Sequence, residues 1–202
     1  MSATSPHALS SEEFLLLHEL RLRGLLQEAD ERHAATLCER GFAQRKGAFL
    51  TLTPDGRELH AAWARLEIGS EEEAVAARAY EQFLPLNVEL LQASTDWQVR
   101  PGNVPNDHSD AHYDWAVIDR LGEIDERAGP IVRRLGSVVE RFSGYRRRLR
   151  HSLSRVREGE HEWFLSPRID SYHTVWMQLH EDLLLALGRD RTEEEQQRAG
   201  GT

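Results

Sequence analysis

The amino-acid sequence predicts a mainly α-helical protein with a small antiparallel β-sheet in its N-terminal third. Two observations predict this fold. Residues 37–60 hold the end of a helix, a glycine stop at Gly41, two short β-prone runs around a basic tip, a turn and the start of a new helix. From residue 69 onward, apolar residues recur at the spacing of amphipathic helices, which predicts an all-α C-terminal domain.

Composition and charge exclude several classes of protein. The chain has 202 residues, of which 40% are hydrophobic and 29% charged, as in ordinary soluble globular proteins. The apolar runs are too short to cross a bilayer and no signal pattern begins the chain, so we expect a cytoplasmic protein with no membrane partner. Cys38 is the only cysteine, which excludes an intrachain disulfide and a cysteine-rich zinc site. The net charge of −9 argues against a uniformly basic nucleic-acid binder.

The N-terminal region, residues 1–68, is predicted to alternate helices and short strands. The first helix begins at Ser10 or Ser11, where Glu12 and Glu13 suit the helix dipole. Residues 24–28 are interpreted as the collapsed remnant of a helix. The remaining predicted elements are a helix over 30–40, strands over 42–44 and 48–51, a turn over 53–56 and a helix over 57–68.

A sequence pattern across this region resembles the winged helix of the MarR-like bacterial regulators. The pattern is L-x-x-R-G-F-x-x-R followed by L-T-x-x-G-R, and it covers the first third of the chain. The matching residues are Leu37, Arg40, Gly41, Phe42, Arg45, Leu52, Thr53, Gly56 and Arg57. The resemblance implies a small β-wing that contacts DNA. On that basis we expect DNA contacts from Arg32, Arg40, Arg45 and Lys46.

The segment before the wing departs from the family pattern. A helix-turn-helix needs on the order of 20 residues, and only residues 25–40 lie between the first helix and the wing. The winged helix therefore has a shortened helix-turn-helix. Two interpretations stay open: a wing that contacts DNA, and a winged helix kept as a packing or dimerisation module.

The C-terminal domain, residues 69–190, is predicted to be a bundle of about five helices, followed by a disordered tail over 191–202. Pro85 interrupts the first helix, a long loop covers 94–115, and Gly129-Pro130 separates two helices. Further helices are expected over 145–157 and from Ser166-Pro167 to 187. The segments TDWQ, NDHSDAHYD and SPRIDSYHTVWMQLHEDLL resemble a helical region of actinobacterial regulator-like proteins.

The last helix predicts a ligand site. His173, Met177 and His180 share one helical stripe, with Trp176 one turn away. Such a stripe suits a polar pocket between helices, and the alternative is a pair of core histidines satisfied by their neighbours. The predicted ligand-binding residues are Trp97, His108, Tyr172, His173, Trp176 and His180.

The sequence gives little support for a metal site or a cofactor site. His108 and His112 lie four residues apart among the carboxylates of Asp107, Asp110 and Asp114, and His180 or Glu181 would have to join them to hold a metal. The segment lacks the glutamate of a zincin motif, so we predict no metal. No phosphate-binding glycine loop occurs, and we predict no cofactor. Two interpretations of the basic stretch 141–157 stay open. It contacts the phosphates of DNA or an anionic ligand, or it pairs with the protein's own acidic residues.

These observations predict a winged-helix regulator-like protein with a helical domain for ligand binding or dimerisation. Its expected partners are DNA through the wing, a small molecule in the helical domain, and a second copy in a homodimer. The alternative is a small-molecule-binding protein or enzyme of specialised metabolism whose winged helix no longer binds DNA. A third possibility is an interaction module for a larger phosphotransfer enzyme.

Overall fold

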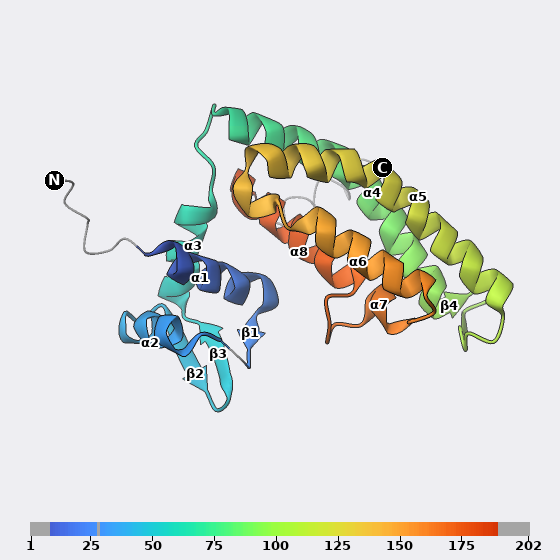
Figure 1. Cartoon of the computed structure of the whole chain (residues 1–202), viewed down its shortest axis with the longest axis horizontal. Helices are drawn as coiled ribbons and strands as arrows, with labels where there is room; N and C mark the ends of the chain where they lie inside the picture. The colour runs from blue at the N-terminus through green and yellow to red at the C-terminus, as the bar shows by residue number, and fades with distance from the viewer. Residues whose placement is uncertain (1–8, 28, 190–202) are drawn as a thin grey trace. The chain divides into compact units, whose positions relative to one another are not determined.

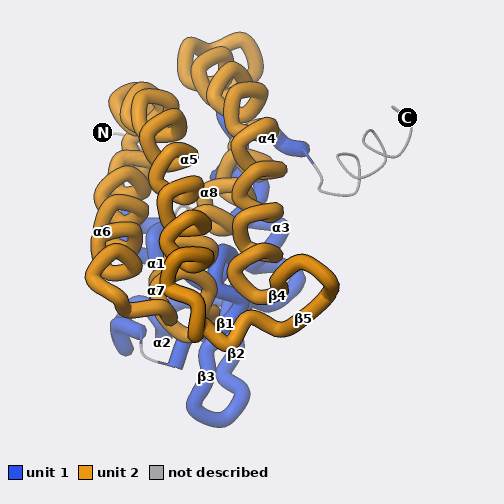
Figure 2. Tube along the Cα trace, turned by 90° about the vertical axis from the view of Figure 1, so that its right-hand side faces the viewer, with its two compact units in different colours: residues 1–66, 188–202 blue, residues 67–187 orange. Residues whose placement is uncertain are grey.

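The computed structural model describes residues 9–27 and 29–189. The chain divides into two compact units, shown in different colours in Figure 2: unit 1 is residues 1–66 with 188–202, and unit 2 is residues 67–187. The predicted fold class is confirmed, because the structure is mainly α-helical and carries a small β-wing (Figure 1). Among the described helices, none has the length and apolar character needed to cross a membrane. The predicted tail lies outside the described residues.

Unit 1 has three helices and a three-stranded antiparallel sheet in its described part. The strand order is β1-β3-β2, and β2 and β3 form the wing. In chain order the elements are α1 (Ser11–Arg23), β1 (Leu25–Leu26), α2 (Glu31–Glu39), β2 (Ala43–Lys46), β3 (Phe49–Leu52) and α3 (Pro54–Ala64).

The predicted helix remnant over 24–28 is wrong. Gly24 ends α1 with a positive φ of 79°, and the next two residues form β1, with Leu25 opposite Thr51 and Leu26 opposite Leu50. Pairing with β3 satisfies the backbone, and the alternation of a strand exposes Leu25 while burying Leu26. Only α2 therefore lies between β1 and the wing, where a helix-turn-helix would need two helices.

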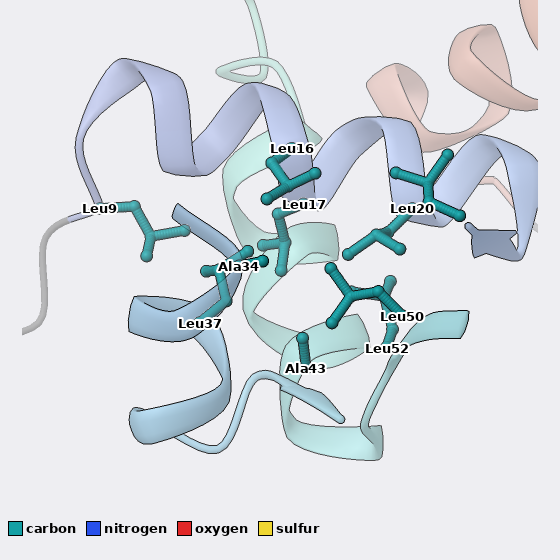
Figure 3. Packing of buried hydrophobic residues seen from close by; sticks show 10 residues of the cluster. Leu9, Leu16, Leu17, Leu20, Ala34, Leu37, Ala43, Leu50 and Leu52 are labelled. Carbon is teal, nitrogen blue, oxygen red and sulfur yellow. The ribbon is translucent and has the colours of Figure 1, made fainter. Parts of the chain in front are cut away.

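Leucine side chains from every layer of unit 1 meet in one core (Figure 3). Leu17 and Leu20 of α1, Leu37 of α2 and Leu50 of β3 are almost completely buried in it. At 1.5–3 kcal/mol for each fully buried leucine, this cluster is the main source of stability for the small unit.

The motif L-T-x-x-G-R has a packing function in unit 1. The Thr53 hydroxyl donates to the carbonyl of Gly41 at 2.6 Å and accepts from the amide of Gly56 at 3.0 Å. A Cβ added at Gly56 would lie 1.9 Å from the carbonyl oxygen of Phe42. Only glycine lets the first turn of α3 approach the start of the wing so closely.

We expect Gly56→Ala to lower the free energy of unfolding of unit 1 by about 1–3 kcal/mol or more, because the backbone of Phe42 has to move. Chemical denaturation followed by circular dichroism measures the change. Gly144→Ala is the control, since nothing lies within 4 Å of a Cβ at that position. Equal unfolding midpoints for the two variants would show that the close approach does not constrain unit 1.

Unit 2 is built on two long helices, α4 and α5, which pack side by side (Figure 1). A short antiparallel hairpin connects them, and α6 and α8 pack against the pair and against each other. In chain order the elements are α4 (Glu71–Gln98), β4 (Val99–Arg100), β5 (Val104–Pro105), α5 (Ala111–Val138), the 3-10 helix η1 (Glu140–Phe142), α6 (Tyr145–Arg157), α7 (Glu162–Leu165) and α8 (Tyr172–Leu187).

The predicted breaks in the long helices are wrong. Pro85 lies inside α4 and Pro130 lies inside α5. Residues on both sides of each proline are buried, including Phe83 and Leu86 around the first and Ala128 and Val132 around the second. Packing of these continuous faces outweighs the cost of about 3 kcal/mol that a proline imposes within a helix.

Two other boundaries differ from the prediction. α4 continues to Gln98, so the predicted loop over 94–115 is reduced to the hairpin and a short connection before α5. α8 begins at Tyr172, because the Ser171 hydroxyl accepts from the amide of Thr174 and caps the helix. The short α7 was not predicted.

Arginines of the basic stretch 141–157 pair with the protein's own acids. Arg146 contacts Asp125 at 2.5 Å and Arg141 contacts the fully buried Asp182 at 2.9 Å. Each carboxylate also accepts from a tyrosine hydroxyl, Tyr172 for Asp125 and Tyr145 for Asp182. Burial, followed by the neighbouring carboxylates, raises the pKa of both tyrosines well above the usual value, so they remain hydrogen-bond donors.

We expect Asp182→Leu to lower the free energy of unfolding of unit 2 by about 3–5 kcal/mol, since it leaves the cation of Arg141 without its carboxylate in a buried position. The double variant Arg141→Met/Asp182→Leu should recover most of this loss. Thermal and urea unfolding measure both variants.

The matched control is Glu89→Ala, which breaks the half-exposed pair with Arg127 and should change the free energy of unfolding by less than about 1 kcal/mol. A loss from Asp182→Leu no larger than that from the control would contradict a structural role for the buried pair.

Candidate functional site

The tip of the wing presents two of the predicted DNA-contacting residues to solvent. Arg45 and Lys46 are exposed at the end of β2. The Arg45 guanidinium lies 2.5 Å from the carboxylate of Glu31 at the start of α2. Because both side chains are exposed, this ion pair adds little to the stability of unit 1.

The other two predicted DNA-contacting residues have different environments. Arg32 is exposed on α2. Arg40 is only partly exposed, lies 3.5 Å from Glu13 of α1 and stacks over the ring of Phe42. Arg40 therefore joins α1 to the start of the wing, and its predicted contact with DNA stays a prediction.

The six predicted ligand-binding residues do not form one pocket. Tyr172, Trp176 and His180 are buried in the core of unit 2. The Trp176 indole donates to the side chain of Asn87 at 3.0 Å, and the His180 ring packs 5.1 Å from the ring of Phe83. Tyr172, Trp176 and His180 of the stripe on α8 therefore pack within the helical core of unit 2. His173 of the same helix is half-buried.

The remaining two predicted residues, Trp97 and His108, meet at the end of α4. Their ring centroids lie 4.5 Å apart. They line an open pocket of about 470 Å³. Its lining residues are Trp97, Gln98, Asn106, His108, His161, Glu162, Leu165 and Ser166.

A buried carboxylate organises the polar side of this pocket. Asp114, in the first turn of α5, is only 4% exposed. One of its oxygens accepts from the side-chain amide of Asn106 at 2.8 Å, and the other lies 3.0 Å from Nδ1 of His108. The Asn106 amide also donates to the carbonyl of Trp97 at 3.1 Å. His108 has a positive φ of 58°, a conformation that non-glycine residues seldom adopt unless their surroundings hold them.

His161 is the member of this site that the sequence did not reveal. It precedes α7, and its ring lies 5.1 Å from the ring of His108 and edge-on to Trp97 at 5.2 Å. Ligand atoms of His108, Asp114 and His161 all lie within 4.8 Å of one another. No periodicity or motif distinguishes His161 in the sequence, and only the fold places it beside His108.

Of the metal ligands considered from the sequence, the described part of the structure groups His108 and Asp114, and it adds His161 to them. His112 is exposed. Asp107 accepts from the Ser109 hydroxyl and Asp110 caps α5 through the amide of Tyr113. These two hydrogen bonds are also the leading reasons why the pKa of each aspartate lies below its usual value. Both carboxylates therefore stabilise local structure outside the histidine pair.

The chain matches no protein-family model, no curated protein and no solved structure. The resemblance of the N-terminal third to MarR-like regulators therefore remains a hypothesis.

Burial lowers the pKa of His173 below its ordinary value of 6.5. Just below pH 6.5 the unfolded chain therefore binds more protons at this ring than the folded protein does. The corresponding stability is complete above pH 6.5 and is lost as the pH falls toward the pKa of the folded state.

We expect His173→Gln to flatten the rise in the free energy of unfolding with pH in this window, since glutamine does not titrate. Urea unfolding at a series of pH values measures the slope. Identical slopes in the wild type and His173→Gln would contradict the burial effect.

Proposed function

We propose that this chain is a regulator-like cytoplasmic protein that contacts DNA through the wing of unit 1 and binds a small ligand in unit 2. The observation that carries the DNA contact is the β1-β3-β2 sheet, which presents Arg45 and Lys46 at an exposed tip. A cationic wing of this kind is suited to the phosphate backbone, where charge decides affinity.

The mode of DNA contact follows from the single helix α2. Sequence readout in the major groove needs a helix that is positioned by a partner helix and that presents several donors. Between β1 and the wing the chain has α2 alone, with no second helix there to form a helix-turn-helix, and of the two arginines predicted on it only Arg32 is exposed, while Arg40 is paired with Glu13. We therefore expect phosphate contacts with weak dependence on base sequence. A homodimer with its two copies of α2 about 34 Å apart would add affinity by reaching successive grooves.

A specific observation favours a second candidate function. The pocket at Trp97, His108 and His161 lies wholly within unit 2 and needs no contribution from the wing. An open pocket with an aromatic wall and convergent polar groups is typical of a small-molecule site. In this candidate function, the protein binds its ligand and unit 1 has kept the winged helix without DNA binding. The experiment below separates the two, because only the first predicts binding to DNA.

We expect the full chain to bind a fluorescent DNA duplex in an anisotropy assay at low salt, with an affinity that falls as salt rises. Arg45→Ala/Lys46→Ala should weaken binding and make the dependence of log K on log salt shallower by about 2, since two phosphate contacts are lost.

The control is Arg147→Ala/Arg150→Ala, which removes the same charge from exposed positions on α6. Equal affinities for the wing variant and the wild type would refute the proposed contact. An equal loss in both variants would show that net charge, rather than the wing, determines the affinity.

A further inference from the structure

We infer that His108, Asp114 and His161 form a binding site for a divalent transition-metal ion of the zinc class. The inference rests on the ligand-binding half of the proposed function and is independent of any DNA contact, because all three residues belong to unit 2. The metal would lie beside Trp97, whose ring contacts the rings of both histidines.

The distances suit a metal after a small adjustment of one side chain. Zinc binds imidazole nitrogen and carboxylate oxygen at about 2.0–2.2 Å, so neighbouring ligand atoms of a tetrahedral site lie about 3.4 Å apart. His108 Nδ1 and Asp114 already lie at 3.0 Å. His161 is exposed and precedes α7, so its ring can move by the remaining ångström or so without disturbing the core. An ion placed there would take the position of the hydrogen between His108 and Asp114.

The site is also held in place by a second layer of contacts. The amide of Asn106 donates to the Asp114 oxygen that does not face His108, which fixes the orientation of the carboxylate. The backbone amide of His108 in turn donates to the side-chain oxygen of Asn106 at 3.3 Å. Metal ligands in proteins are commonly oriented by such outer hydrogen bonds, and losing them weakens metal binding.

The ligand types select the class of ion. Two imidazoles with one carboxylate favour zinc and the neighbouring divalent transition metals, whereas magnesium and calcium prefer oxygen ligands throughout. Three protein ligands leave a fourth position, and two of the ligand residues, His108 and His161, line the open pocket. A water molecule or an oxygen atom of a small anionic ligand would complete the coordination. Trp97 offers that ligand an apolar surface.

Isothermal titration of the untagged, EDTA-treated full chain with zinc chloride tests the inference. The wild type should bind one zinc ion with a defined Kd. His161→Ala and Asp114→Asn should each weaken Kd by at least about tenfold, as expected for loss of a ligand. Cobalt chloride should give the visible absorption of a four- or five-coordinate ion with the wild type and lose it with His161→Ala. Magnesium chloride should not compete.

His112→Ala is the matched control, since it removes an exposed histidine four residues from His108 and should leave Kd unchanged. Because His161 is exposed, His161→Ala decides the question even where Asp114→Asn fails to fold by circular dichroism. Absence of zinc binding by the wild type would overturn the inference, as would equal Kd values for the wild type and His161→Ala. DNA binding is measured separately in EDTA, so failure of either property is recognised independently of the other.

Discussion

The carboxylate of Asp114 is the group on which the candidate site depends. It is buried at the start of α5 and contacts both Asn106 and His108, so it ties the connection after the β4-β5 hairpin to the helix that follows. Since Asn106 also bonds to the end of α4, the same network sets how the two long helices of unit 2 are joined. A buried carboxylate is stable only with such partners. The hydrogen bonds of this one carboxylate therefore order the connection between the hairpin and α5, which helps to form the pocket.

The two units differ in where their charged side chains lie. Unit 2 buries charge within its helical core, where arginines of α6 and the segment before it meet the carboxylates of α5 and α8. This use accounts for part of the basic stretch, since Arg141 and Arg146 pair with buried carboxylates whereas Arg147 and Arg150 are exposed. Unit 1 instead has an apolar leucine core (Figure 3) and keeps ion pairs such as Arg45–Glu31 on its surface.

Local signals in the sequence predicted the elements that depend on nearby residues. Ser10, Thr53 and Ser70 each cap a helix by a hydrogen bond three residues away, and such caps can be recognised without knowing the fold. β1 has two residues and forms through pairing with β3, so no local sequence pattern predicts it. The stripe on α8 has the same spacing whether it faces a pocket or a core, and burial alone decided between them. His161 meets His108 from 53 positions away along the chain, beyond the reach of any spacing rule.

The central claim is that Asp114 holds the His108 ring in place beside His161, so that both rings can bind one metal ion. The most direct measurement is long-range ¹H–¹⁵N NMR of the histidine rings in the full chain, with and without zinc. The account predicts one fixed tautomer for His108 in the metal-free protein, with Nδ1 protonated toward the Asp114 carboxylate. On addition of zinc, the ring signals of His108 and His161 should shift together while those of His112 stay in place. Averaged tautomers for His108, or zinc shifts confined to other histidines, would contradict it.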